Sequence, residues 1–151
     1  QQDPSNAAAY RQNTATFLAS LKPLLATIER IKSDYAGTAV LYTEPVLGYV
    51  LTLTGLQSLT PVGFSQAIED GDEPSPQDTQ TIEKLITEKN IKVLLYNSQA
   101  TSPVTQQIQK LARQNGIAIV PVTETLPTNK KSYQSWQQEQ LNSLLKALQS
   151  E

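Results

Sequence analysis

Cysteine and histidine are both missing from this chain of 151 residues. The absence of cysteine excludes disulfide bonds and thiol nucleophiles. Without cysteine or histidine, the usual soft and nitrogen ligands for metal ions and the usual general base of enzymes are lost as well. The chemistry left to the chain is therefore that of carboxylates, hydroxyls, amides and lysines.

Long apolar runs and a surplus of basic charge are also missing. The sequence has no run of 18 apolar residues, so we predict no membrane insertion by this segment. Its 12 basic and 14 acidic residues are spread along the chain, which argues against the concentrated basic face that binds nucleic acid. The glycines do not form a phosphate-binding loop, and no serine lies in a G-x-S-x-G turn.

The first 36 residues have the pattern of a long helix. Asp3 and Pro4 are suited to the helix start. Pro23 predicts a kink, or a division of the helix in two. Apolar residues recur three, four or seven positions apart, as expected of one helical stripe: Tyr10, Phe17, Leu21, Leu24, Ile28 and Ile31.

The remaining residues alternate between short apolar runs and amphipathic segments. We expect strands at 38–43, 59–64, 91–96 and 117–122, the second being the weakest signal. We expect helices at 44–54, from Ser75-Pro76 onward, at 102–115 and at 132–149, with an acidic loop at 69–76. Such alternation predicts an α/β fold, a four-stranded parallel sheet sandwiched by helices and preceded by the long N-terminal helix.

Three polar residues follow strands of this predicted sheet. Glu44 comes directly after the first strand, Asn97 after the third, and Glu124 two residues past the fourth. Ligands of open parallel sheets bind beyond the carboxyl ends of the strands, and two carboxylates with an amide are oxygen donors for a cation. Glu44 could instead serve only the start of a helix, and Asn97 only a turn.

Two other uses of acidic residues fit less well. A phosphoacceptor receiver domain would need an aspartate where the chain has Asn97. The acidic residues Glu69, Asp70, Asp72 and Glu73 do not have the spacing of an EF-hand calcium loop, so we interpret them as a solvated loop.

A family resemblance covers nearly the whole chain. It includes Thr43-Glu-Pro-Val-Leu-Gly-Tyr49 with Leu53-Thr-Gly-Leu56, which resembles the ligand-bearing segment of the metal-binding receptors (solute-binding lipoproteins) of bacterial ABC importers of zinc or manganese. Further similar segments follow the same order: Asp3 to Tyr10, Glu73 to Pro76, Ile91 to Asn97, Val122 to Leu126, and Tyr133 with Asn142 to Leu148.

The resemblance implies two α/β lobes joined by a rigid helix, with a metal ion between them. Residues 1–36 would be the backbone helix between the lobes and 37–151 the C-terminal lobe, with the N-terminal lobe absent from this chain. Glu44 falls on the third ligand position, where glutamate is typical of manganese receptors and histidine of zinc receptors. Glu124 falls on the fourth position, which is usually aspartate. Asn97 falls where the family usually has a glutamate, and it would orient the ligands without contacting the metal.

The function implied by the resemblance is extracytoplasmic capture of Mn2+ or Zn2+ and its delivery to the membrane permease of an ABC importer, without enzymatic turnover. The protein would be periplasmic or lipid-anchored at the cell surface. One alternative is a degenerate, metal-free lobe that serves as a surface adhesion or interaction module. Another is an α/β enzyme that uses Glu44 and Glu124 as an acid/base pair, which no nucleophile or histidine supports.

Overall fold

The computed structural model describes residues 3–129 and 132–150. Its centre is a parallel sheet in the order β2-β1-β3-β4, formed by β1 (Ala39–Tyr42), β2 (Gln57–Ser58), β3 (Val93–Asn97) and β4 (Ala118–Val122). All three strand pairs are parallel, as the alternation of strands and helices predicted. The predicted fold class is therefore confirmed.

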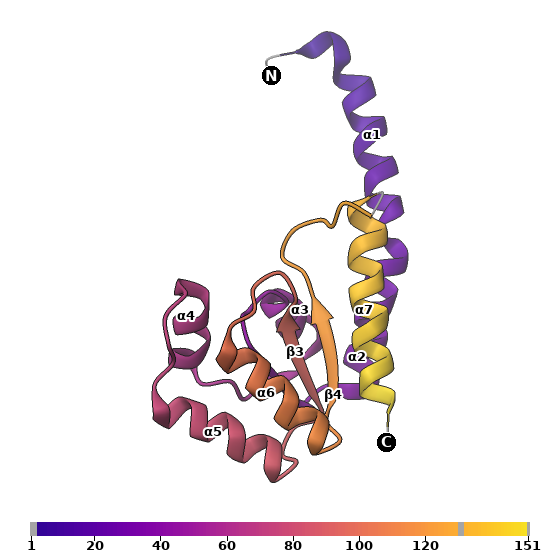
Figure 1. Cartoon of the computed structure of the whole chain (residues 1–151). Helices are drawn as coiled ribbons and strands as arrows, with labels where there is room; N and C mark the ends of the chain where they lie inside the picture. The colour runs from indigo at the N-terminus through magenta and orange to yellow at the C-terminus, as the bar shows by residue number, and fades with distance from the viewer. Residues whose placement is uncertain (1–2, 130–131, 151) are drawn as a thin grey trace.

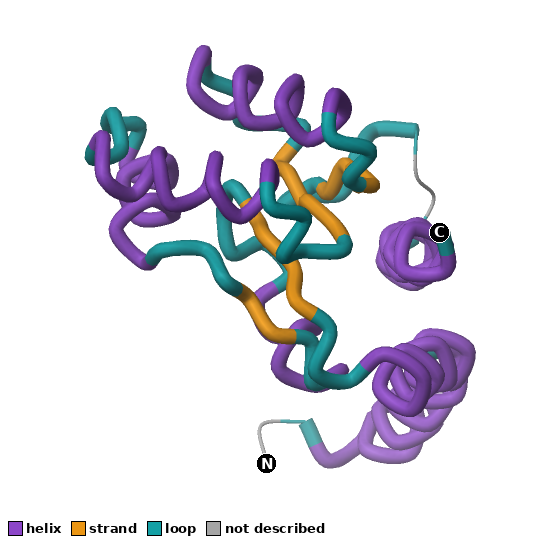
Figure 2. Tube along the Cα trace, turned by 90° about the horizontal axis from the view of Figure 1, so that it is seen from below, coloured by secondary structure: helices purple, strands orange, loops and turns teal. Residues whose placement is uncertain are grey.

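Helices cover both faces of the sheet (Figure 2). One face packs against α2 (Lys22–Tyr35), α3 (Gly48–Thr54) and α7 (Tyr133–Gln149). The other packs against α4 (Val62–Asp70), α5 (Pro76–Thr87) and α6 (Pro103–Gln114). Alternate residues of β1, β3 and β4 enter the two cores, which explains why these three strands are largely apolar. The short edge strand β2 is polar and exposed.

The N-terminal helix is divided in two. A 3-10 turn, η1 (Pro4–Asn6), leads into α1 (Ala7–Ser20), and α2 begins after a break at Leu21, with Pro23 in its first turn. Proline lacks the N–H that a continuous helix would use, which explains the break. The predicted division of the helix is therefore confirmed. Figure 1 shows α1 extending away from the sheet, beyond the end of α7.

The predicted strand at 59–64 is wrong. Pairing in β2 ends at Ser58, and Val62 already belongs to α4. Beyond Ser58, a side chain replaces the backbone as the hydrogen-bond partner of β1. The hydroxyl of Thr60 accepts from the N–H of Tyr42 and donates to the Tyr42 carbonyl. Pro61 then supplies no N–H and precedes the first turn of the helix.

Two neighbouring boundaries also differ from the prediction. The helix expected from Glu44 begins only at Gly48, because the preceding residues form turns in which Val46 N–H donates to the carbonyl of Glu44 and Gly48 N–H to that of Pro45. The acidic segment expected to be entirely loop contributes Glu69 and Asp70 to the end of α4. Both errors lie beside the predicted site.

The remaining helix boundaries agree with the prediction to within one residue at the N-terminal ends. Ser75, Ser102 and Ser132 each accept a hydrogen bond from the backbone N–H three residues later.

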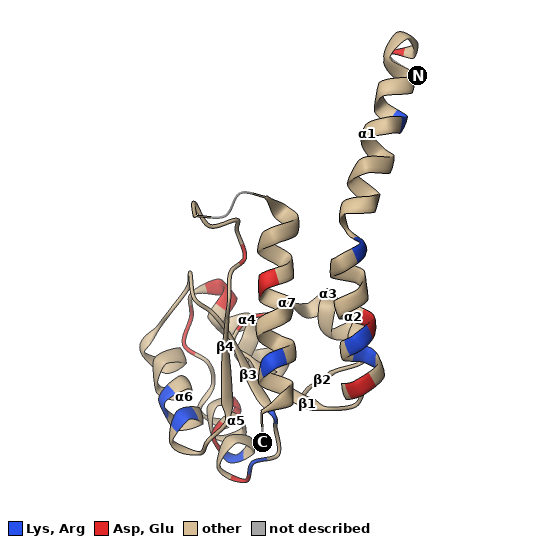
Figure 3. Ribbon diagram, turned by 90° about the vertical axis from the view of Figure 1, so that its right-hand side faces the viewer, with Lys and Arg blue, Asp and Glu red and all other residues tan. Residues whose placement is uncertain are grey.

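Across the described ranges, every helix is too short or too polar to cross a bilayer. Lysine and arginine residues lie on several helices, including α2, α6 and α7 (Figure 3).

Candidate metal site

Glu44 lies just beyond the carboxyl end of β1. Thr43 extends the strand, since its N–H donates to the carbonyl of Leu95 on β3 at 3.0 Å. The turns after Glu44 then carry the chain away from the sheet, which leaves the Glu44 side chain at the sheet edge and only 8% exposed. A carboxylate buried to this extent needs compensation from its surroundings.

Asn97 provides part of that compensation. It is the last residue of β3, beside β1 in the sheet, and its Nδ2 donates to Oε2 of Glu44 at 2.7 Å. Its backbone N–H donates to Oγ1 of Thr43, and its Oδ1 accepts the N–H of Gln99 at 2.9 Å. Because the amide oxygen is held by an N–H donor, the amide NH2 group must face Glu44.

The second carboxylate oxygen of Glu44 is different. Oε1 is buried and has no hydrogen-bond partner among the described residues. A buried, half-satisfied carboxylate destabilises a folded protein unless a donor or cation satisfies it. Oε1 of Glu44 is therefore available to a hydrogen-bond donor or to a cation.

Glu124 lies across the same edge of the sheet, two residues beyond β4, and its side chain is exposed. Its segment is anchored on one side by α7. There, Oε1 of Gln140 accepts the N–H of Thr123, and the indole N–H of Trp136 donates to the Thr123 hydroxyl, both at 2.7 Å. On the other side, Oε1 of Gln99 accepts the N–H of Glu124 at 2.9 Å.

Glu44 and Glu124 line one cavity of about 550 Å³, as expected of residues at a single sheet edge. Glu69 of α4 and Tyr49 of α3 line it as well, and none of its lining residues is lysine or arginine. The cavity therefore carries three carboxylates and is electronegative. Within residues 3–129 and 132–150, however, no three acidic, histidine or cysteine side chains lie close enough together to hold one metal ion.

Sequence reasoning missed two residues of this site. Glu69 was assigned to a solvated loop, and taking Pro61 as a helix start would have placed it on α4 beside the site. Gln99 carried no recognisable signal, because its contacts with residues 124 and 125 depend on how two loops meet in space. The assignment of Glu44 and Glu124 as metal ligands stays a prediction.

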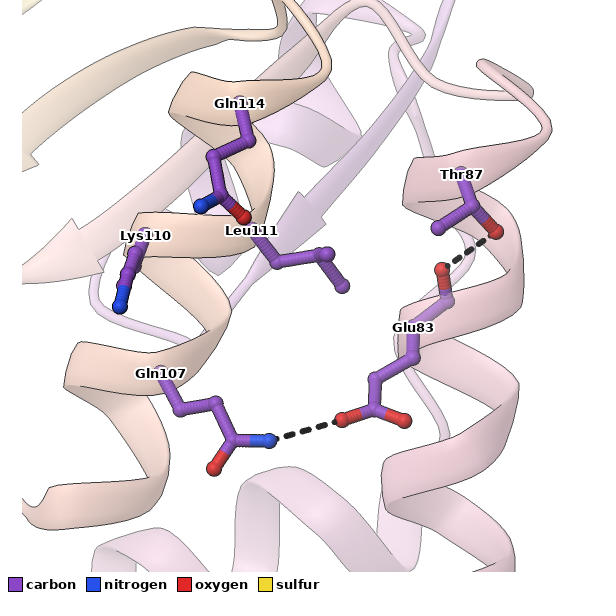
Figure 4. A pocket seen from close by; sticks show the side chains of 6 residues that line it. All are labelled: Glu83, Thr87, Gln107, Lys110, Leu111 and Gln114. Atoms are coloured by element: carbon purple, nitrogen blue, oxygen red, sulfur yellow. Dashed lines mark hydrogen bonds between the residues drawn. The ribbon is translucent and has the colours of Figure 1, made fainter.

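A second cavity, of about 350 Å³, lies between α5 and α6 (Figure 4). Its carboxylate, Glu83, accepts a hydrogen bond from Nε2 of Gln107 at 3.1 Å. None of its lining residues belongs to the cavity of Glu44 and Glu124. It offers a single, already paired carboxylate and so does not resemble a metal site.

Comparisons with solved structures found several proteins that share this fold. The laminin-binding protein Lmb of Streptococcus agalactiae, described as a bifunctional protein with adhesin and metal transporting activity, superposes with a TM-score of 0.76 at 19% identity, over 98% of this chain and 56% of its own. The solute-binding protein FpvC of Pseudomonas aeruginosa, in complex with Mn2+, gives a TM-score of 0.73 at 22% identity, over 98% and 54%. A Zn(II)-bound variant of AdcAII of Streptococcus pneumoniae gives 0.73 at 19%, over 97% and 52%.

The chain thus spans about half the length of the solved proteins it resembles, and at these identities the likeness shows the fold alone. A search of curated proteins found no match. A family model described as the periplasmic component A of a zinc-uptake complex, ZnuA, matches residues 1–147, nearly the whole chain. The chain belongs to the ZnuA family of metal-uptake receptors.

Proposed function

We propose that this chain is the C-terminal lobe of a receptor that captures Mn2+ or Zn2+ outside the cytoplasm and delivers it to the permease of an ABC importer. Glu44 and Glu124 are the metal ligands contributed by this lobe, and Asn97 positions Glu44. The observation that carries the proposal is the buried, unpaired Oε1 of Glu44, in a carboxylate that lines the same cavity as Glu124. Carboxylate oxygens suit Mn2+ and are also found among zinc ligands.

The remaining ligands come from a second lobe, which this proposal places on the other side of the cavity. Two carboxylates are fewer than the four ligands typical of a zinc site, in agreement with the lack of a three-residue cluster in the described part of the chain. The description of the family refers to zinc uptake and to no chemical reaction. We therefore propose no catalytic role for Glu44 and Glu124.

The long helix supports the same arrangement. None of the α1 residues is buried, and Tyr10, Phe17 and Leu18 are each about half exposed. Exposed apolar side chains on a helix that leaves its own lobe indicate a partner surface. In this proposal residues 1–36 join the lobes and the second lobe covers α1. Solution scattering of the two-lobe protein tests this part. Data showing that the two lobes move independently would contradict it.

Calorimetric titration of the two-lobe receptor with MnCl2 and with ZnCl2 tests the metal assignment. Glu44→Gln should weaken binding of both ions by about a hundredfold or more, because an amide is a poorer ligand than a carboxylate for a divalent cation. Glu44→His should shift the preference from Mn2+ towards Zn2+, which accepts nitrogen ligands more readily.

Glu83→Gln is the matched control, since it makes the same change in the cavity between α5 and α6. It should leave both affinities unchanged. Wild-type affinity in Glu44→Gln would mean that Glu44 serves only the local fold, and the metal proposal would fail. Retained binding to a host-surface protein by that same variant would then favour the adhesion module.

A further inference from the structure

The loops that follow β3 and β4 are tied together by one side chain, that of Gln99. Its Oε1 accepts the backbone N–H groups of Glu124 at 2.9 Å and Thr125 at 3.0 Å. Its Nε2 donates to the hydroxyl of Thr125 at 2.9 Å. A single amide therefore holds two consecutive residues of the segment that carries Glu124.

The other end of this connection leads to Glu44. The backbone N–H of Gln99 donates to Oδ1 of Asn97, and Nδ2 of Asn97 donates to Oε2 of Glu44. The bonds at 2.7, 2.9 and 2.9 Å form an unbroken path from the Glu44 carboxylate, through Asn97 and Gln99, to the backbone of Glu124. All of these are good hydrogen-bond distances.

The two carboxylates differ in how firmly the rest of the fold holds them. Glu44 is buried and held by the end of the sheet, whereas Glu124 is exposed on a loop. The Thr123 contacts with α7 anchor the residue before Glu124, but not Glu124 itself or Thr125. Gln99 makes the backbone contacts that orient those two residues.

We infer that Gln99 is a positioning residue that sets the placement of Glu124 relative to Glu44 in the metal-free protein. This inference rests on the proposed function. A metal ion fixes its ligands within a few tenths of an ångström, so a ligand held in advance loses less freedom on binding. Groups that orient ligands without touching the metal typically change affinity by about 10–100-fold.

Three variants of the two-lobe receptor separate positioning from general stability. Gln99→Leu removes both the acceptor and the donor at similar size. Gln99→Glu keeps an acceptor oxygen for the N–H groups of Glu124 and Thr125. Gln106→Leu makes the same change at an exposed glutamine of α6 and is the matched control.

The first measurement is amide hydrogen exchange of residues 123–126 without metal. Gln99→Leu should speed exchange at Glu124 and Thr125, while Gln99→Glu and Gln106→Leu should keep wild-type protection. The second is titration with ZnCl2 and MnCl2. Gln99→Leu should bind about tenfold more weakly with a melting temperature close to that of the wild type, and Gln99→Glu should recover most of the affinity.

Glu44→Gln in the same titration keeps the two proposals distinguishable. If Glu44→Gln binds metal as the wild type does, the metal proposal fails, and the exchange measurement still decides whether Gln99 holds the segment. If Glu44→Gln is weakened but Gln99→Leu is not, the role of Gln99 is overturned alone. Unchanged exchange at Glu124 and Thr125 in Gln99→Leu overturns it as well.

Discussion

The replacement of Glu44 by glutamine should stabilise the metal-free protein while it weakens metal binding. Glu44 is 8% exposed, and it receives one hydrogen bond, from Asn97, while its Oε1 is buried without a partner among the described residues. An uncompensated buried charge costs several kcal/mol, of order 3–5. A glutamine has the same shape, keeps the hydrogen bond from Asn97, and leaves a buried unpaired amide that costs about 1–3 kcal/mol.

The difference between these costs gives the expected gain. Taking the middle of each range, Glu44→Gln should raise the unfolding free energy of the metal-free protein by about 2 kcal/mol, equal to about 4–8 °C in melting temperature. The assay is thermal unfolding followed by circular dichroism, with a chelator present. Metal at a concentration 100 times the wild-type Kd should stabilise the wild type by about 2.7 kcal/mol and the variant far less, so the order of stability should reverse.

Glu124→Gln is the matched control for this experiment. Glu124 lines the same cavity but is exposed, so its substitution should change the metal-free stability by less than about 0.5 kcal/mol. A Glu44→Gln variant that is less stable than the wild type in chelator would refute the reasoning, because the carboxylate would then be stabilising the fold itself.

Three further predictions concern other parts of the structure. Gly55 has a φ of +71° and a Cβ there would lie 3.3 Å from a neighbouring side chain, so Gly55→Ala should cost about 1 kcal/mol or more in denaturant unfolding. Hydrogen bonds, that from Asn6 foremost, lower the pKa of Asp3 from 3.8 to about 2. The stabilisation from this depressed pKa is present above pH 3.8 and should be lost as the pH falls to about 2, seen as faster amide exchange at the start of α1. Thr123→Val removes the acceptor of the Trp136 indole N–H and should lower stability by about 1–2 kcal/mol in thermal unfolding.

Each of these has its own control. Gly37→Ala has a similar φ, +84°, but open space around its Cβ, so it should cost less than Gly55→Ala, and an equal cost would exclude the steric explanation. Asp3→Asn should abolish the increase in amide exchange between pH 3.8 and about 2. If the increase persists in this variant, groups other than Asp3 cause it. Thr123→Ser keeps the hydroxyl and should be near wild type, whereas a loss as large as that of Thr123→Val would point to packing.

The local features of this protein could be predicted from its sequence. Alternating elements predicted a parallel sheet, and strand ends placed Glu44, Asn97 and Glu124 at its carboxyl edge. Ser75, Ser102 and Ser132 marked helix starts correctly, because a cap involves residues only three positions apart. The same local reasoning failed at 59–64, where a short apolar run fitted strand and helix equally well.

The contacts that hold the site could not be predicted in this way, because they join segments far apart in the sequence. Strand order places β3 beside β1, and only that neighbourhood brings Asn97 to Glu44 across 53 positions of the chain. The burial of Glu44, its unpaired oxygen and the tie from Gln99 to Glu124 follow from the same packing. No periodicity encodes such contacts, because each depends on where two distant segments meet and on which polar groups the core leaves without water.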